Sequence, residues 1–168
     1  MAEQKIKYGS DVALTIAAWT TTLLAGEWAT SSIFDNTTSL FEDVLLGGII
    51  ELAATTPLVG ETLDIYIIGQ YSGTATDMTG GIDALLTAAA EQVADVDFVI
   101  ANLKLLVQID VEATTPAIAQ GYQWGPESVR AIFGEMPQRF ALLLRNNTGA
   151  ALAAGSDVNT VGVTHTIV

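Results

Sequence analysis

The clearest structural signal in the sequence is the alternation of side chains over residues 61–71. Leu63, Ile65 and Ile67 share one face of an extended chain, because successive side chains of a strand point to opposite sides. Tyr66 falls on the other face with polar and apolar neighbours. The segment therefore predicts a strand and is the best strand candidate in the chain.

Similar patterns recur along the chain and predict about eight strands. The other segments expected to be extended are residues 11–17, 29–34, 45–55, 103–111, 139–145, 150–155 and 158–168. In residues 103–111, strict alternation places Leu103 and Leu105 on one face and Leu106 on the other. The pair Gly47-Gly48 inside a strand indicates a bulge or the close approach of another backbone.

Helical signals are limited to two short stretches. Apolar residues at helical spacing predict a helix over residues 82–94. One or two turns are expected within residues 125–134, with Pro126 in the first turn and Gly134 just past the end. Many strands with few short helices in loops predict an all-β antiparallel jelly-roll or β-sandwich rather than an α/β fold.

Residues 137–155 admit a helical or an extended interpretation. Phe140, Leu142 and Leu144 share one face of an extended chain, and the other face has an arginine at each end. Asn146 begins a turn-forming cluster that ends at Gly149. We expect a strand, a tight turn and a second strand or extended arm, in a hairpin-like pair. Residues 150–155 carry almost no side chain, which indicates a backbone running close to a neighbouring strand or subunit.

Composition limits the function classes. Of 168 residues, 50% are hydrophobic and 15% are charged, and the formal net charge is −13. Few charges are typical of a chain that hides surface in an assembly, and the acidity argues against nucleic acid or an anionic membrane as a partner. There is no cysteine, and therefore no disulfide or thiolate ligand.

The chain is expected to form a single domain, residues 11–168, preceded by an extended N-terminal arm, residues 1–10. The first residues contain no apolar segment typical of a secretory signal, and no run is long enough to span a membrane as a helix. We expect the arm to rest on another protein surface or on a neighbouring copy, because chain ends fray unless they are held.

Catalytic motifs are weak throughout. His165 is the only histidine, no serine lies in a G-x-S-x-G motif, and we expect His165 to be structural. Two acidic pairs are candidates for carboxylate catalysis: Glu42 with Asp43, and Asp64 with Asp110. No spacing distinguishes either pair from solvated strand faces. Asp95 and Asp97 form an incomplete calcium pattern. We therefore predict no catalytic, cofactor-binding or metal-binding residues and no enzymatic activity.

Several motifs occur together in a characteristic order. They are YGS at residues 8–10 followed by ALTIAAW, SSIFDNTT at 31–38, LLGGII at 45–50, IYIIGQYSGT at 65–74, and YQWGPESVRAIFGEMPQRFALLLRNNTGAALAAG at 122–155. This order resembles small virion proteins of tailed bacteriophages. The resemblance implies a non-enzymatic jelly-roll capsid decoration (cement) protein, made in the bacterial cytoplasm and bound as a homotrimer to the outer head surface. Its implied partners are the major capsid protein and copies of itself.

Basic and aromatic residues are the candidates for contacts with partners. These residues are Lys5, Lys7, Tyr8, Trp28, Trp124, Arg139 and Arg145. The tryptophans are expected to be core or interface anchors, whereas exposure beside carboxylates would favour a sugar-binding platform. The alternative function is accordingly a receptor- or glycan-binding module of a phage tail fibre or baseplate.

Overall fold

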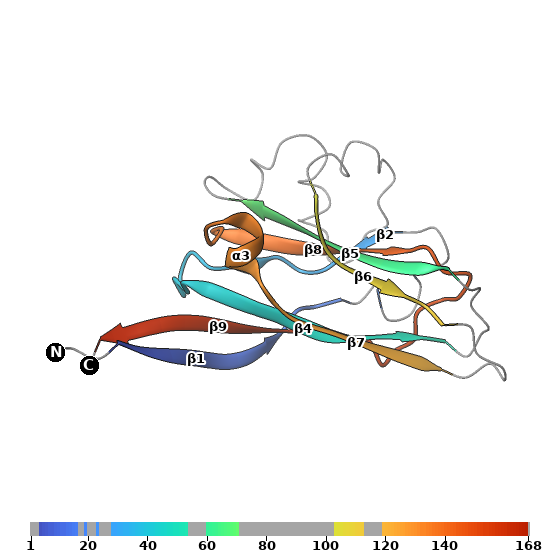
Figure 1. The fold of residues 1–168 in the computed structure, drawn as a ribbon, viewed down its shortest axis with the longest axis horizontal. Helices are drawn as coiled ribbons and strands as arrows, with labels where there is room; N and C mark the ends of the chain where they lie inside the picture. The colour runs from blue at the N-terminus through green and yellow to red at the C-terminus, as the bar shows by residue number, and fades with distance from the viewer. Residues whose placement is uncertain are drawn as a thin grey trace.

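The computed structural model describes residues 4–16, 19, 23, 28–53, 60–70, 103–112 and 119–167. Within these residues, nine strands form two antiparallel sheets, and there is one short α-helix. The sheets lie face to face as two layers (Figure 1). The helix expected over residues 82–94 lies outside the described residues. No described helix is long and apolar enough to cross a membrane.

Each sheet combines strands from distant parts of the chain. Sheet A contains, in spatial order, β1 (Gln4–Ala13), β9 (Asp157–Ile167), β4 (Asp43–Leu52) and β7 (Gln120–Ser128). Sheet B contains β2 (Trp28–Thr30), β8 (Arg139–Asn146), β5 (Thr62–Gln70) and β6 (Lys104–Asp110), with β3 (Phe34–Asp35) also paired to β8.

Strand pairing is nested along the chain. β1 pairs with β9, β2 and β3 with β8, β4 with β7, and β5 with β6, and every pair is antiparallel. We count β2 and β3 as one interrupted strand. The first strand then pairs with the last, the second with the second last, and so on inward, with successive pairs in alternate sheets. This wrapping is that of a jelly roll, so the predicted fold class is confirmed.

The main hydrophobic core lies between the two sheets. Leu63, Ile65 and Ile67 of β5 are fully buried in it, so the face predicted from alternation is confirmed. Phe140 of β8 stacks on Phe34 of β3 with ring centroids 4.8 Å apart. The core therefore follows the two-residue periodicity of the strands.

A second apolar cluster covers the opposite face of sheet B. Its buried members are Trp28, Ile68, Ala141 and Leu143. β5 and β8 thus have apolar side chains on both faces, which agrees with strands whose two sides are covered.

The strand predicted over residues 103–111 is present as β6, but its expected strict alternation is wrong at Leu105 and Leu106. Ile65 pairs with Val107 and Tyr66 with Leu105, so β6 contains an extra residue at this point. Leu106 packs against the main core, whereas Leu105 is 52% exposed. A β-bulge reverses the faces on either side of it, and strict alternation does not anticipate this change.

The second predicted helix is present with the expected length of one to two turns, but it begins later than Pro126. Helix α3 (Val129–Phe133) begins after Ser128, whose hydroxyl oxygen accepts a hydrogen bond from the Ala131 N–H at 3.0 Å. Gly134 follows with φ +87°, as predicted for the residue past a helix end. Pro126 was expected in the first turn, but it lies in β7 because Ser128 supplies the extended capping residue.

Residues 137–155 form a strand and a turn but no hairpin. The Asn146 side chain accepts hydrogen bonds from the Thr148 N–H (3.0 Å) and hydroxyl (2.6 Å), which closes the predicted turn. The chain then crosses to sheet A, where the Ala153 N–H donates to the Glu51 carbonyl at 2.6 Å. The hairpin-like pair is therefore wrong, because β8 and the following strand belong to different sheets. The expected close approach of backbones is present, at the end of β4.

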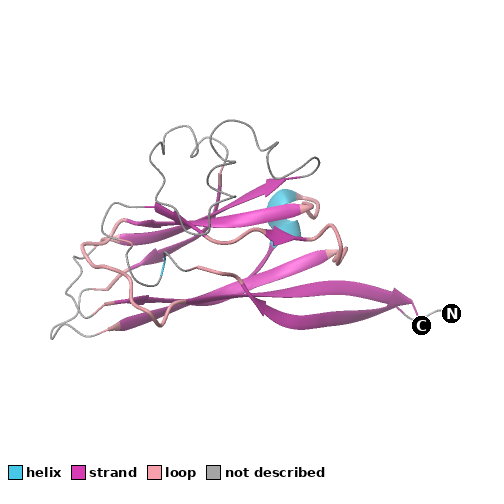
Figure 2. Ribbon diagram, turned by 180° about the vertical axis from the view of Figure 1, so that it is seen from behind, coloured by secondary structure: helices cyan, strands magenta, loops and turns pink. Residues whose placement is uncertain are grey.

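One end of sheet A extends past the rest of the molecule. β4 pairs with β9 only as far as Val163, whereas β1 and β9 continue to pair from Tyr8 to Gln4. Residues 4–8 and 163–167 therefore form a two-stranded projection, here called the ribbon (Figures 1 and 2). The segment expected to be an extended arm, residues 1–10, thus supplies the first half of β1 from Gln4 onward.

Candidate interaction surface

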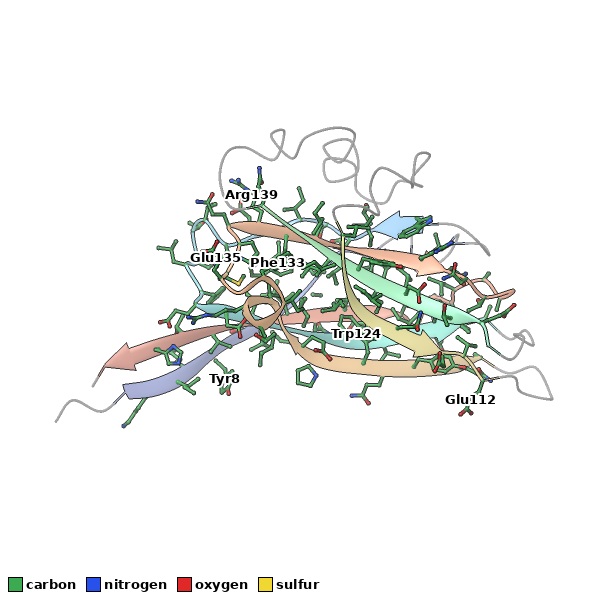
Figure 3. All side chains as sticks on the ribbon, turned by 45° about the horizontal axis from the view of Figure 1, so that its top comes forward. Tyr8, Glu112, Trp124, Phe133, Glu135 and Arg139 are labelled. Atoms are coloured by element: carbon green, nitrogen blue, oxygen red, sulfur yellow. The ribbon has the colours of Figure 1, made fainter. Side chains whose placement is uncertain are left out.

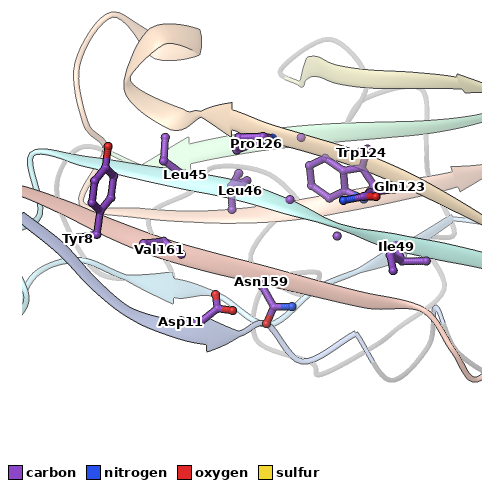
Figure 4. Close-up of a pocket in the computed structure, with 13 residues that line it drawn as sticks. Tyr8, Asp11, Leu45, Leu46, Ile49, Gln123, Trp124, Pro126, Asn159 and Val161 are labelled. Atoms are coloured by element: carbon purple, nitrogen blue, oxygen red, sulfur yellow. The ribbon is translucent and has the colours of Figure 1, made fainter.

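The outer face of sheet A contains a groove with a volume of about 510 Å³ (Figure 4). Its lining comes from all four strands of the sheet. The lining residues are Tyr8, Asp11, Leu45, Leu46, Gly47, Gly48, Ile49, Gln123, Trp124, Gly125, Pro126, Asn159 and Val161. Apolar side chains and exposed backbone predominate, with one carboxylate and two amides among them.

The groove forms where the side chains of β4 are interrupted. Leu45 and Ile49 point outward from β4, and Gly47 between them has no side chain to fill the space. The pairs Leu46 with Glu127 and Gly48 with Trp124 show that β7 has one extra residue opposite Gly47. The bulge predicted from the glycine pair is therefore confirmed, and it lies at the floor of the groove.

The ribbon continues this outer face beyond the groove. Ile6 lies opposite His165 and Tyr8 opposite Val163, so these side chains share the face that carries the groove. Ile6 is 58% exposed and Tyr8 is 59% exposed. Large apolar side chains are seldom this exposed over a continuous area unless they meet a partner.

Lys5 and Lys7 stand on the opposite face of the ribbon and are exposed. Both belong to β1, the edge strand of sheet A. Lysine side chains on an edge strand also discourage uncontrolled pairing with other strands. The two predicted basic contacts are thus close to the exposed apolar residues of the ribbon.

The two tryptophans predicted as contact residues are buried. Trp124 is 6% exposed and packs in the main core beside the groove. Trp28 is 4% exposed and lies against Tyr66, with ring centroids 5.4 Å apart. Neither indole offers a face on which a sugar ring could stack, whereas the prediction of core anchors is confirmed.

The two arginines of β8 lie on sheet B, away from the ribbon. Arg139 Nε is 3.0 Å from Asp35 Oδ2, and the Arg145 guanidinium lies 5.1 Å from the centre of the Trp28 ring. Figure 3 shows Arg139 and Tyr8 on different sheets. The seven predicted contact residues therefore divide between two surfaces, and only Lys5, Lys7, Tyr8 and Trp124 belong to sheet A.

The first candidate acidic pair makes local structural contacts. Glu42 Oε2 lies 2.6 Å from His165 Nδ1, and hydrogen bonding from the imidazole lowers the pKa of the Glu42 carboxyl. Asp43 accepts hydrogen bonds from the Ser128 hydroxyl (2.6 Å) and the Arg130 N–H (2.9 Å) at the start of α3. These contacts tie β4 to its neighbours.

The second candidate acidic pair is also accounted for by packing. Asp64 is buried and accepts hydrogen bonds from Gln108 (2.8 Å) and Asn147 (2.6 Å), while Asp110 pairs with Thr62. Asp95 and Asp97 lie outside the described residues. Over the part of the chain that the structure describes, no three potential metal ligands gather.

The groove could be only partly anticipated from the sequence. Leu45, Gln123, Asn159 and Val161 line it but belong to three different strands. Their positions depend on the register of β4 with β7 and β9, which no local pattern specifies. The glycine pair at Gly47 was the one sequence signal that pointed to this place.

Comparison with known proteins identifies no relative. No protein-family model matches the chain, and no curated protein is significantly similar to it. The class of protein is defined here by the fold alone: it is a jelly-roll β-sandwich with a groove and a projecting ribbon on one sheet.

Proposed function

We propose that this chain is a non-enzymatic structural protein of a tailed-bacteriophage particle, specifically a capsid decoration (cement) protein. In this role it binds the outer head surface and stabilises neighbouring capsid subunits. The observation that supports the proposal best is the ribbon, which projects from the sandwich with Ile6 and Tyr8 more than half exposed. An extended, partly apolar projection suits contact with another protein better than it suits chemistry on a small substrate.

The groove beside the ribbon favours the same kind of role. It is open, lies on a sheet face and is floored by glycine backbone at Gly47. Three of the four acidic residues of the two candidate pairs, Glu42, Asp43 and Asp64, have carboxylates engaged in contacts between strands or with the start of α3. A protein that stabilises a shell needs apolar and backbone contact with neighbours, and this surface provides it.

The charge of the chain is consistent with an outward position on a particle. Its net charge of −13 disfavours contact with packaged DNA and with anionic membranes. The partners we propose are the major capsid protein and further copies of this chain, as a homotrimer. The corresponding location is the outer surface of the virion head.

Labelling of virions tests this role. Antibodies against the recombinant chain would be applied to purified particles of the tailed phage whose genome encodes it, with particles of a deletion strain as control. Label spread evenly over the head is the expected result. Label at the tail tip would favour a receptor- or glycan-binding module, although burial of Trp28 and Trp124 argues against a sugar platform. Particles without label would reject both roles.

A further inference from the structure

Sheet A carries two features that match each other, a groove and a projecting ribbon. We propose that the ribbon of one copy lies in the groove of a neighbouring copy, with Ile6 directed into the groove. This contact deepens the proposed function and rests on it, because it names the surfaces through which copies of the chain associate.

The chemistry of the groove fits an apolar strand end. Gly47 leaves room in the floor, and Leu45 and Ile49 stand on either side of it along β4. Ile49 is 44% exposed, so a side chain that covers it removes apolar surface from water. Ile6 is an apolar side chain of suitable size on the same chain.

The charges of the two features are also complementary. Asp11 lines the groove, and Asp157 is exposed on β9 in register with Ile49. The ribbon carries Lys5 and Lys7, two of only six bases in a chain with 19 acids. Their long side chains belong to the edge strand and can bend around it toward acidic groups beside the groove.

Three of the other bases lie on sheet B, away from the ribbon. Lys104 Nζ donates to the Ile132 carbonyl at 2.9 Å, Arg139 pairs with Asp35 at 3.0 Å, and Arg145 lies over Trp28. The ribbon combines an exposed apolar side chain, Ile6, with the basic residue Lys7 in one projecting element, and a second copy is the partner that supplies it.

The ribbon cannot occupy the groove of its own chain. β9 runs without interruption from the groove into the ribbon, pairing with β4 up to Val163 and with β1 beyond it. The ribbon consequently leaves along the sheet and points away from the groove (Figure 1). Because the end of the ribbon around Ile6 and the groove are different patches that share only Tyr8, each copy donates one ribbon and receives another, and the contacts close where the rotation between copies forms a ring.

Cysteine crosslinking tests the contact directly, since the chain has no cysteine of its own. The variants Ile6→Cys and Gln123→Cys would be mixed and oxidised, and the products separated on a non-reducing gel. We expect a disulfide-linked pair in the mixture. The matched control is Ile6→Cys with Leu105→Cys, because Leu105 is 52% exposed on sheet B; this mixture should give no linked pair.

Surface variants provide a second measurement by sedimentation. Ile6→Asp should weaken self-association about tenfold or more, because it would place an unpaired charge in an apolar contact, whereas Leu105→Asp should leave it unchanged. Circular dichroism would confirm that both variants fold. A chain that stays monomeric, equal effects of the two variants, or Ile6→Cys linking only to itself would each overturn the ribbon–groove contact.

The contact and the proposed function can fail separately. Label on the phage head without a link between Ile6→Cys and Gln123→Cys would overturn the contact and retain the decoration role. A specific link with no label on virions would retain the contact and reject the decoration role.

Discussion

The imidazole of His165 joins the ribbon to the segment before β4 through the Glu42 carboxylate. His165 Nδ1 lies 2.6 Å from Glu42 Oε2, and the His165 backbone N–H donates to Oε1 at 3.2 Å. These hydrogen bonds favour the ionised carboxylate, so the pKa of Glu42 lies below its ordinary value of 4.5. The pair fixes the point at which β9 leaves the body of sheet A.

This relationship predicts an acid dependence of stability. A carboxyl group whose pKa is lower in the folded state stabilises that state above its unfolded pKa, and the contribution is lost as pH falls through the folded pKa. Replacement Glu42→Gln should therefore reduce the free energy of unfolding at pH 7, and the reduction should shrink as pH falls from 4.5, the ordinary value for the carboxyl, through its lowered folded-state pKa. Urea titrations of both proteins at pH 7, 4 and 3 would measure the difference.

His165→Ala provides the matched control for the acid dependence. It should remove the same pH-dependent difference, and adding it to Glu42→Gln should change little more, because the two residues act as one pair. A Glu42→Gln effect of equal size at pH 7 and pH 3 would contradict the assignment.

Gly48 has no room for a side chain against β9 and gives a second prediction. A Cβ at this position would overlap the Asp157 carbonyl oxygen and lie 3.0 Å from the Val158 Cα. Backbone cannot yield as a flexible side chain does, so Gly48→Ala should lower the free energy of unfolding by about 3 kcal/mol. Denaturant unfolding would measure the loss.

Gly121→Ala is the control for Gly48→Ala within the same sheet. A Cβ there would meet only the Ile49 side chain, at 3.4 Å. The expected change is within about 0.5 kcal/mol. Similar losses in the two variants would mean that glycine is not required for the spacing of β4 and β9.

The strands and the fold class could be predicted because burial imposes a local pattern. Leu63, Ile65 and Ile67 alternate because one face of β5 meets the core along its whole length. The bulge at Leu106 could not be predicted, since one extra residue leaves no mark in composition. The turn at Asn146 was predicted correctly from its residues. The same turn residues occur whether the chain returns to its own sheet or crosses to the other sheet, so they did not indicate the crossing.

The candidate surface was less predictable than the fold for a related reason. Tyr8 and Lys7 could be proposed as contact residues from their aromatic and basic side chains alone. The groove depends on the two registers that bring Leu45, Gln123 and Val161 together, and register is a tertiary property. Sequence patterns therefore located individual residues of the surface but not the hollow between them.

Asn146 holds the crossing from sheet B to sheet A and gives a third prediction. Its side chain is fully buried and donates to the carbonyls of Leu23 (3.1 Å) and Ala150 (2.8 Å) while accepting from Thr148. Asn146→Ala would leave several buried polar groups unpaired and should cost about 3 kcal/mol of unfolding free energy.

Asn159→Ala is the control for Asn146→Ala. Thermal and denaturant unfolding of both variants would measure the two losses of stability. Asn159 is only partly buried, and its amide donates to the Asp157 carboxylate at 2.8 Å. Its loss should cost less than about 1 kcal/mol. A small effect at Asn146 would show that water satisfies the carbonyls of the crossing and that the side chain does not hold it.

Leu40 combines an unfavourable backbone conformation with an exposed side chain and gives the last prediction. Its φ is +49°, in the left-handed region, and its side chain is 73% exposed. Asn36 holds the turn, because its side chain accepts from the Phe41 N–H (2.8 Å) and donates to the Phe41 carbonyl (3.0 Å). The surrounding hydrogen bonds thus maintain a conformation that leucine disfavours.

Asparagine tolerates the left-handed region better than leucine does. Leu40→Asn should raise the free energy of unfolding by about 1 kcal/mol, or the melting temperature by about 2–4 °C. Leu40→Ala removes the same exposed side chain but keeps the unfavourable backbone, so it should leave stability unchanged. Equal stability of the two variants would reject backbone strain at Leu40. Loss of head labelling in both variants, with stability retained, would instead show that the strain serves to present Leu40 to a partner.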